Sequence, residues 1–181
     1  MKKVLILSGS PRKGGNSDIL CDEFARGASD RGNAVEKVFI AEKKIAPCSG
    51  CYFCKEHGGR CALNDDMTEL LQKIIDCDVL VLSSPVYFYA VCAQLKTVID
   101  RTVARWTELA NKDLYYIMTS ADDESDTMDG TLACMRGFAK CIDGYYEQGV
   151  LYGKGVSEKG DVLNRPELMQ IAYEMGLSVH D

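Results

Sequence analysis

Residues 4–17, Val-Leu-Ile-Leu-Ser-Gly-Ser-Pro-Arg-Lys-Gly-Gly-Asn-Ser, decide the fold of this chain. Their first part, Val4 to Leu7, is a short apolar run without polar alternation, which is typical of a strand buried on both faces of a parallel sheet. A turn rich in glycine and hydroxyl groups follows, and then a helical pattern whose apolar side chains are Leu20, Phe24 and Ala28. This strand–turn–helix unit predicts an open α/β sheet with a ligand site at the turn.

The rest of the chain repeats the alternation of strand and helix. Further apolar runs are found at Ala34 to Ile40, Val79 to Leu82, Leu114 to Met118 and Val150 to Tyr152. Between and after these runs, residues recur at the spacing of one face of a helix. The four sets are Met67, Leu70, Leu71, Ile74 and Ile75; Leu95, Val98, Ile99 and Thr102; Leu132, Met135, Ala139 and Ile142; and Leu168, Ile171, Ala172 and Met175. We therefore predict a doubly wound, five-stranded parallel sheet of order 2-1-3-4-5 between two helical layers.

Several residues mark the expected helix ends. Asn16 or Ser17 is expected to cap the first helix, and Asp66 with Glu69 resembles a capping box for the second. Pro166 is expected to open the last helix, and Gly176 to close it.

Composition excludes several classes of protein. The 181 residues carry 21 Lys and Arg against 27 Asp and Glu, so the net charge of −6 argues against nucleic acid as the main partner. No apolar run approaches the ~20 residues of a membrane span. Met-Lys-Lys followed by Val4 to Leu7 is expected to be too short for a signal-peptide core, because it runs straight into the strand–turn–helix motif. We expect one domain, residues 1–181, in the cytoplasm, with no membrane partner.

The turn after the first strand carries the groups that bind phosphate. Backbone amides converge at such a turn, and a helix begins there with partial positive charge. The side chains expected to contribute are Ser8, Ser10, Arg12, Asn16 and Ser17, with Gly15 allowing close approach. Gly9 and Gly14 have the spacing of the phosphate loop of nucleoside triphosphatases, G-x-x-x-x-G-K-[ST], but Gly15 and Asn16 stand where that motif has Lys and Ser or Thr. The dinucleotide-binding motif G-x-G-x-x-G does not match either, because Ser10-Pro11 stands where its second glycine should be.

Two blocks at this spacing resemble the flavodoxin-like NAD(P)H-dependent FMN reductases. One is Ser8 to Ser17, and the other is Ser83-Ser84-Pro85-Val86-Tyr87-Phe88-Tyr89 followed by Gln94-Leu95-Lys96-Thr97-Val98-Ile99-Asp100-Arg101. A weaker match lies near the C-terminus, at residues 160–176. The resemblance implies a flavodoxin-like fold, non-covalently bound FMN, and homodimers or homotetramers in which Trp106 and Tyr89 are candidate contacts.

The same resemblance assigns the flavin ring to the second block. Isoalloxazine needs apolar walls and backbone donors, and the residues expected to supply them are Pro85, Val86, Tyr87 and Phe88. Three consecutive aromatic residues, 87–89, cannot all face one core, so at least one is expected to serve a site or an interface. Thr119 and Ser120, after the fourth strand, are expected to complete the site.

One segment, residues 41–65, is too long for a connecting loop of this fold and contains four cysteines. Their positions, Cys48, Cys51, Cys54 and Cys61, resemble the compact motif of iron–sulfur flavoproteins, a branch of the same family with a 4Fe–4S cluster, and Asp65-Asp66-Met67 also resembles that branch. A structural zinc ion and free or oxidised thiols remain alternatives. His57 is a candidate substitute ligand. The other cysteines, 21, 77, 92, 134 and 141, are expected to be small buried side chains.

These features predict an enzyme in which FMN takes electrons from NAD(P)H and passes them to a small acceptor, such as a quinone or flavin, or to a redox protein. No side-chain acid or base is expected to be catalytic, because the cofactor carries the chemistry. Two alternatives are an iron–sulfur flavoprotein that acts mainly as an electron carrier, and a non-catalytic flavin-binding redox sensor.

Overall fold

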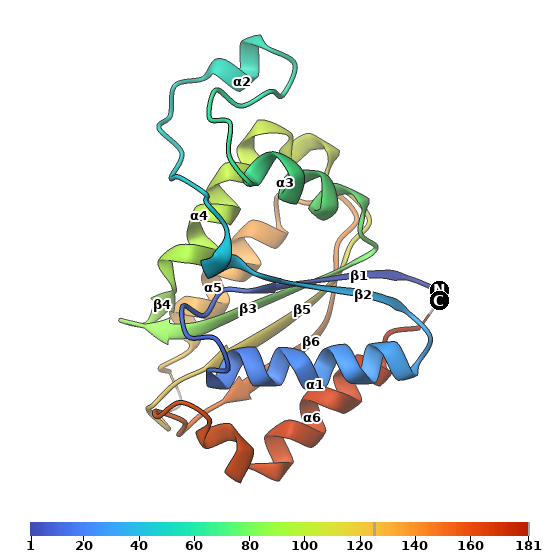
Figure 1. Ribbon diagram of the computed structural model, residues 1–181, viewed down its shortest axis with the longest axis vertical. Coiled ribbons are helices and arrows are strands. Elements are labelled where there is room, and N and C mark those ends of the chain that lie inside the picture. The colour runs from blue at the N-terminus through green and yellow to red at the C-terminus, as the bar shows by residue number, and fades with distance from the viewer. Residues whose placement is uncertain (125, 181) are drawn as a thin grey trace.

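A parallel five-stranded sheet forms the centre of the molecule (Figure 1). The computed structural model describes residues 1–124 and 126–180. The five parallel strands are β1 (Lys3–Ser8), β2 (Ala34–Phe39), β3 (Val79–Tyr87), β5 (Asp113–Thr119) and β6 (Tyr146–Gly153), in the order β2-β1-β3-β5-β6. The predicted flavodoxin-like order is therefore confirmed. A two-residue strand, β4 (Ala90–Val91), pairs antiparallel with β3 and was absent from the sequence prediction.

Helices cover both faces of the sheet (Figure 1). On one face lie α1 (Asn16–Asp30) and α6 (Pro166–Leu177), and on the other lie α3 (Met67–Asp76), α4 (Ala93–Arg101) and α5 (Asp129–Ala139). Short 3-10 turns occur at Ile40–Glu42, Thr102–Ala104, Trp106–Glu108 and Asp161–Asn164. The segment after β2 projects from the end of the domain and contains the one-turn helix α2 (Phe53–Glu56). Within the described residues, no helix has the length and apolar content to cross a bilayer.

Alternate residues of the central strands enter two separate cores. In β1, Leu5 and Leu7 pack toward α3 and α4, whereas Val4 and Ile6 pack toward α1 and α6. All four side chains are at most 2% exposed. Burial on both faces explains why these runs lack polar alternation, and it leaves the ends of the strands as the place for polar chemistry.

The structure corrects three of the expected helix ends. The residue that caps α1 is Gly15, so neither Asn16 nor Ser17 caps it through a side chain. Asp66 occupies the cap position of α3, but its side chain accepts the Lys44 amide and no amide of the helix. The carboxylate of Asp65 instead accepts the Met67 amide at 3.2 Å. Pro166 opens α6 as predicted, but that helix runs past Gly176 to Leu177.

Gly176 serves packing instead. A Cβ atom at Gly176 would lie 2.1 Å from the Phe24 carbonyl oxygen, and one at Gly27 would lie 2.1 Å from the Tyr173 carbonyl oxygen. The backbones of α1 and α6 therefore cross in direct contact, which only glycine at both positions allows. Ile171, which was expected to be buried on α6, is 43% exposed.

Candidate functional site

A hollow of about 220 Å³ opens at the carboxyl edge of the sheet, between the parallel strands β1 and β3, where the strand order reverses. This is the position at which open α/β sheets bind ligands. Ten of the twelve residues expected to contact the cofactor line it: Ser10, Arg12, Gly15, Asn16, Ser17, Pro85, Val86, Tyr87, Thr119 and Ser120. Three segments far apart in sequence thus meet in one cavity.

The phosphate loop holds its shape through its own hydrogen bonds. The Ser10 hydroxyl lies 3.2 Å from the Arg12 carbonyl oxygen and accepts the Arg12 amide at 3.1 Å. The Gly15 amide donates to the same carbonyl oxygen at 2.8 Å. Since the first amides of α1 have no carbonyl partner within the helix, they provide donors for an anion at this end of the hollow.

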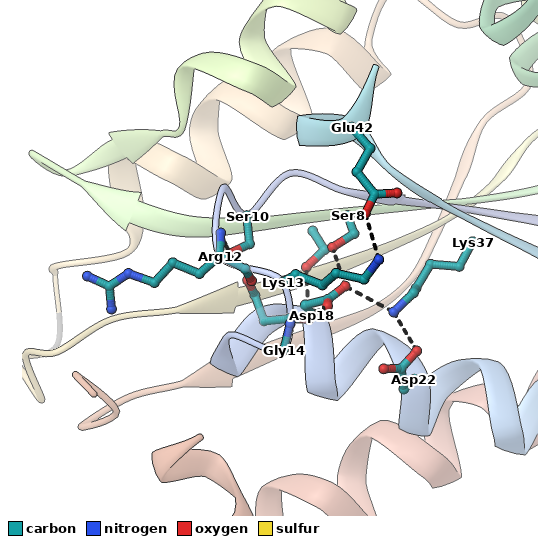
Figure 2. Close-up of polar contacts among 11 residues, drawn as sticks. Ser8, Ser10, Arg12, Lys13, Gly14, Asp18, Asp22, Lys37 and Glu42 are labelled. Carbon is teal, nitrogen blue, oxygen red and sulfur yellow. Dashed lines mark hydrogen bonds and ion pairs between the residues drawn. The ribbon is translucent and has the colours of Figure 1, made fainter. Parts of the chain in front are cut away.

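Asp18 supports the loop from below (Figure 2). Its carboxylate accepts hydrogen bonds from the Ser8 hydroxyl at 2.8 Å and the Gly14 amide at 2.9 Å, and it pairs with Lys37 of β2 at 3.0 Å. Burial by itself would raise the pKa of Asp18, but the Gly14 amide, the Lys37 ammonium and the Ser8 hydroxyl together lower it. Asp18 is therefore an ionised anchor for both ends of the loop.

Asn16 ties the phosphate loop to the segment after β6. Its side-chain nitrogen donates to the carbonyl oxygens of Val156 and Glu158, at 3.2 and 2.8 Å, while its oxygen accepts the amides of Gly160 and Val162. Arg12 reaches the same segment, donating to the Ser157 carbonyl oxygen at 3.3 Å. Asn16 therefore shapes the wall of the hollow as well as lining it.

Ser8 and Phe88 lie outside the hollow. Ser8 is fully buried, with its hydroxyl on Asp18, and Phe88 is fully exposed at the tip of the β3–β4 hairpin. Phe88 and Tyr89 adopt positive φ angles of 49° and 62°, which turn the chain back on itself. Tyr87, Phe88 and Tyr89 are all exposed, so none of the three belongs to the core.

The segment after β6 forms a wall of the hollow that was not predicted from the sequence. Val156, Ser157 and Lys159 line the hollow together with Ala121. Lys159 adds a second cation beside Arg12. The available signal was topological, because every loop after a parallel strand emerges at the same edge of the sheet, but no motif marked these residues.

The residues of the hollow fit FMN. Hydroxyls, amides and the cations Arg12 and Lys159 gather at the α1 end, as a phosphate requires. Pro85, Val86 and Tyr87 provide an apolar wall at the end of β3, as a flat ring requires.

The four clustered cysteines line a second cavity, also of about 220 Å³. It lies in the projecting segment, against the Thr102–Ala104 turn that follows α4, and Cys48, Cys51, Cys54 and Cys61 all contribute. All four are free thiols. Hydrogen bonds from the Phe53 amide and from Ser49 lower the pKa of Cys51, which favours its thiolate. His57 instead stacks on Phe53, with ring centroids 3.6 Å apart.

Arg101 fastens this segment to α4. Its guanidinium forms a two-pronged ion pair with Asp65, at 2.7 and 2.9 Å, and donates to the Ala46 carbonyl oxygen at 2.6 Å. One of the same nitrogens lies 3.5 Å from the sulfur of Cys61. Arg101 is only 2% exposed, so one buried residue joins both ends of the cysteine segment to the helix behind the β3–β4 hairpin.

The donor set of this cavity fits a thiolate-ligated metal centre, because four cysteines line it. The four thiols do not converge on one point. Over residues 1–124 and 126–180, no group of three or more His, Cys, Asp or Glu is close enough to hold a metal ion. Binding would require the thiols to close inward. The identity of the centre remains a prediction.

The remaining cysteines differ in burial. Cys21, Cys77 and Cys92 are buried, as expected, whereas Cys134 is half-buried and Cys141 is exposed, so the expectation was wrong for these two. Burial raises the pKa of the Cys21 thiol to about 12 and that of Cys77 to about 11. These buried thiols are protonated and inert at neutral pH.

Solved structures share this architecture over almost the whole chain. An NAD(P)H:quinone oxidoreductase from Methanothermobacter marburgensis matches with a TM-score of 0.71 at 19% identity, covering 99% of both chains. An azoreductase from Bacillus anthracis matches with a TM-score of 0.72 at 13% identity, covering 98% of this chain and 97% of that one. At such identities the likeness shows the fold alone.

Curated relatives match more closely in sequence over a shorter range. An iron–sulfur flavoprotein of Methanocaldococcus jannaschii is 43% identical over 100 residues, which is 55% of this chain and 51% of the relative. One of Archaeoglobus fulgidus is 46% identical over 101 residues, 56% of this chain and 45% of the relative. The match spans about half the length of these relatives. Residues 2–130 also fit the model of the NADPH-dependent FMN reductases, and the chain belongs to that family.

Proposed function

We propose that this protein is an FMN-dependent NAD(P)H oxidoreductase. The observation that supports it is the meeting of Arg12 and the α1 amides with Pro85 to Tyr87 in one hollow at the switch point of the sheet. FMN supplies hydride and single-electron chemistry when bound. The protein's part is to bind the phosphate, to place the ring against residues 85–87, and to leave one face of the hollow open to a nicotinamide or an acceptor.

Steady-state turnover tests this proposal. FMN-loaded protein is mixed anaerobically with NADH or NADPH, and flavin bleaching at its visible absorption band is followed before and after a quinone acceptor is added. We expect bleaching with at least one nicotinamide and recovery of the absorption with the quinone. A flavin that neither nicotinamide reduces would contradict the enzyme proposal while leaving FMN binding intact.

A second candidate function is supported by the cysteine cavity. With a 4Fe–4S centre in place, the protein would act mainly as an electron carrier; relatives named iron–sulfur flavoproteins support such a centre. The helix α4 connects the two sites, because Cys92, which precedes it, contacts the phosphate loop and Arg101 at its end contacts Cys61. Its nine residues span about 13 Å at 1.5 Å per residue.

Assembly and location belong to the same proposal. Trp106 and Tyr89 are 47% and 60% exposed, and we propose them as contacts of a homodimer or homotetramer in the cytoplasm. Light scattering tests this contact by measuring the molar mass of the wild type and of Trp106→Ala. We expect a smaller assembly for the variant.

A further inference from the structure

A larger cavity, of about 480 Å³, adjoins the four-thiol cavity. It is bounded by residues 58–64, the start of α3 and the end of α4. The two cavities share a wall made of Cys61, Ala62, Leu63, Arg101 and Ala104. The residues of the flavin hollow do not line it.

Three arginines line this cavity, but only one of them lacks a neutralising partner. Arg105 makes a two-pronged pair with Glu108, at 2.7 and 2.6 Å, and Arg101 is paired with Asp65. Arg60 is exposed and forms no ion pair with any described residue. The cavity therefore keeps a net positive charge at one side.

Arg101, which also lines the cavity, has one donor without a partner in the described part of the chain. Arg101 is 2% exposed, and its Nε is a buried nitrogen with no hydrogen-bond partner among the residues that the structure describes. A buried N–H of this kind costs free energy unless an acceptor reaches it. The cavity floor is apolar, since Met67 and Leu71 line it and are 2% and 5% exposed.

We propose that this cavity is a second binding site, for a small organic anion with a flat or apolar body and a carboxylate, sulfonate or phosphate group. The apolar floor takes the body and Arg60 takes the anionic group. The volume lies within the roughly 300–1,000 Å³ range of small-molecule sites. This site goes beyond the proposed function, since it requires neither FMN chemistry nor a metal centre, and it places an anion beside Cys61.

Calorimetric titration of FMN-saturated protein tests this site, because the bound FMN removes the flavin hollow as a competitor. Naphthalene-2-sulfonate serves as the probe, with 2-naphthalenemethanol as the neutral analogue and inorganic sulfate as the anion without an apolar body. We expect one saturable sulfonate site per chain and much weaker binding of the other two. No saturable binding, or equal binding of the neutral analogue, would overturn the proposal.

Three variants locate the site. Arg60→Gln should weaken naphthalene-2-sulfonate roughly tenfold, the loss expected for one charge-assisted hydrogen bond. Arg31→Gln removes the same charge at the far end of α1 and should have no effect. Thr68→Trp fills the mouth of the cavity from the exposed surface of α3 and should abolish binding without changing charge. Equal affinities of the two glutamine variants, or unchanged binding in Thr68→Trp, would place the anion elsewhere.

Discussion

The thiol of Cys92 donates a hydrogen bond to the carbonyl oxygen of Gly9, with the two atoms 3.0 Å apart. The amide of Cys92 donates in turn to the hydroxyl of Ser84 at 2.9 Å. Gly9 belongs to the phosphate loop and Ser84 to the strand that leads into the ring-binding block. One buried residue thus joins the two halves of the proposed flavin site, through its thiol on one side and its backbone amide on the other.

Replacing Cys92 by alanine should loosen this spacing. The variant leaves the Gly9 carbonyl oxygen buried without its donor, at a cost of roughly 1–3 kcal/mol in the free energy of unfolding. We also expect weaker FMN binding, measured by flavin fluorescence titration alongside urea denaturation. Cys92→Ser keeps a donor and should lose less, and Cys141→Ala, at an exposed thiol, is the neutral control. Wild-type behaviour of Cys92→Ala would show that the contact has no positioning role.

Arg12 should carry part of the phosphate affinity. It is exposed at the rim of the hollow and is tethered to Ser157, so a phosphate gains a charge-assisted hydrogen bond without ordering a free side chain. Arg12→Ala should weaken FMN binding roughly tenfold or more. Arg31→Ala removes an equal charge from the opposite end of α1 and should leave the affinity unchanged. An unaltered dissociation constant for Arg12→Ala would mean that the phosphate binds elsewhere.

Asp18 should make the stability of the domain depend on acid pH. Its pKa is lower in the folded protein than in the unfolded chain, so its stabilising effect is complete above the unfolded carboxyl value of about 3.9. The effect is lost as the pH falls through the lowered value. In Asp18→Asn, the urea midpoint should therefore change less than in the wild type between about pH 5 and pH 2. Asp143→Asn, at an exposed site, should keep the wild-type dependence of the urea midpoint on pH. The same dependence in Asp18→Asn would show that the Asp18 carboxylate does not anchor the loop.

The crossing of α1 and α6 should not accept a methyl group. Gly176→Ala would place a Cβ 2.1 Å from a carbonyl oxygen, and we expect a loss of about 2–3 kcal/mol or failure to fold. Gly137→Ala is the matched control on α5, where a Cβ has no neighbour within 4 Å, and it should be neutral or stabilising by about 0.5–1 kcal/mol. Chemical denaturation measures both, and equal stabilities would refute the close crossing.

The cysteine cavity should bind iron through its own four thiols. Anaerobic reconstitution with iron and sulfide should give a brown protein with four irons per chain and absorption near ~400 nm in addition to the flavin bands. Cys61→Ser should reduce the bound iron, whereas Cys134→Ser, outside the cavity, should not. A yellow wild-type protein that retains FMN without iron would exclude the cluster, and zinc in its place would support the structural alternative.

Much of the fold followed from local pattern. Doubly buried strands such as β1 lack polar alternation, and the helices between them show regular apolar spacing, so the alternation of strand and helix could be predicted. The strand order followed from the doubly wound fold class to which this alternation points. The helix ends were less predictable. Glycine at position 176 is typical of a helix C-terminus, but here it lies inside α6, where the absence of a side chain lets the backbone of α1 approach.

The sequence by itself determined the strands, the helices between them and the turn after β1, because periodicity and turn chemistry are properties of neighbouring residues. Only the tertiary structure decided what depends on distant residues. It brought Lys159 to the hollow, turned Phe88 outward on a left-handed hairpin, and used Arg101 to hold Cys61 and Asp65 against α4. The contacts of Lys159 and Arg101 join residues 36 to 149 positions apart, which no local pattern encodes. The positive φ angles of Phe88 and Tyr89 fall on residue types that do not signal such a turn.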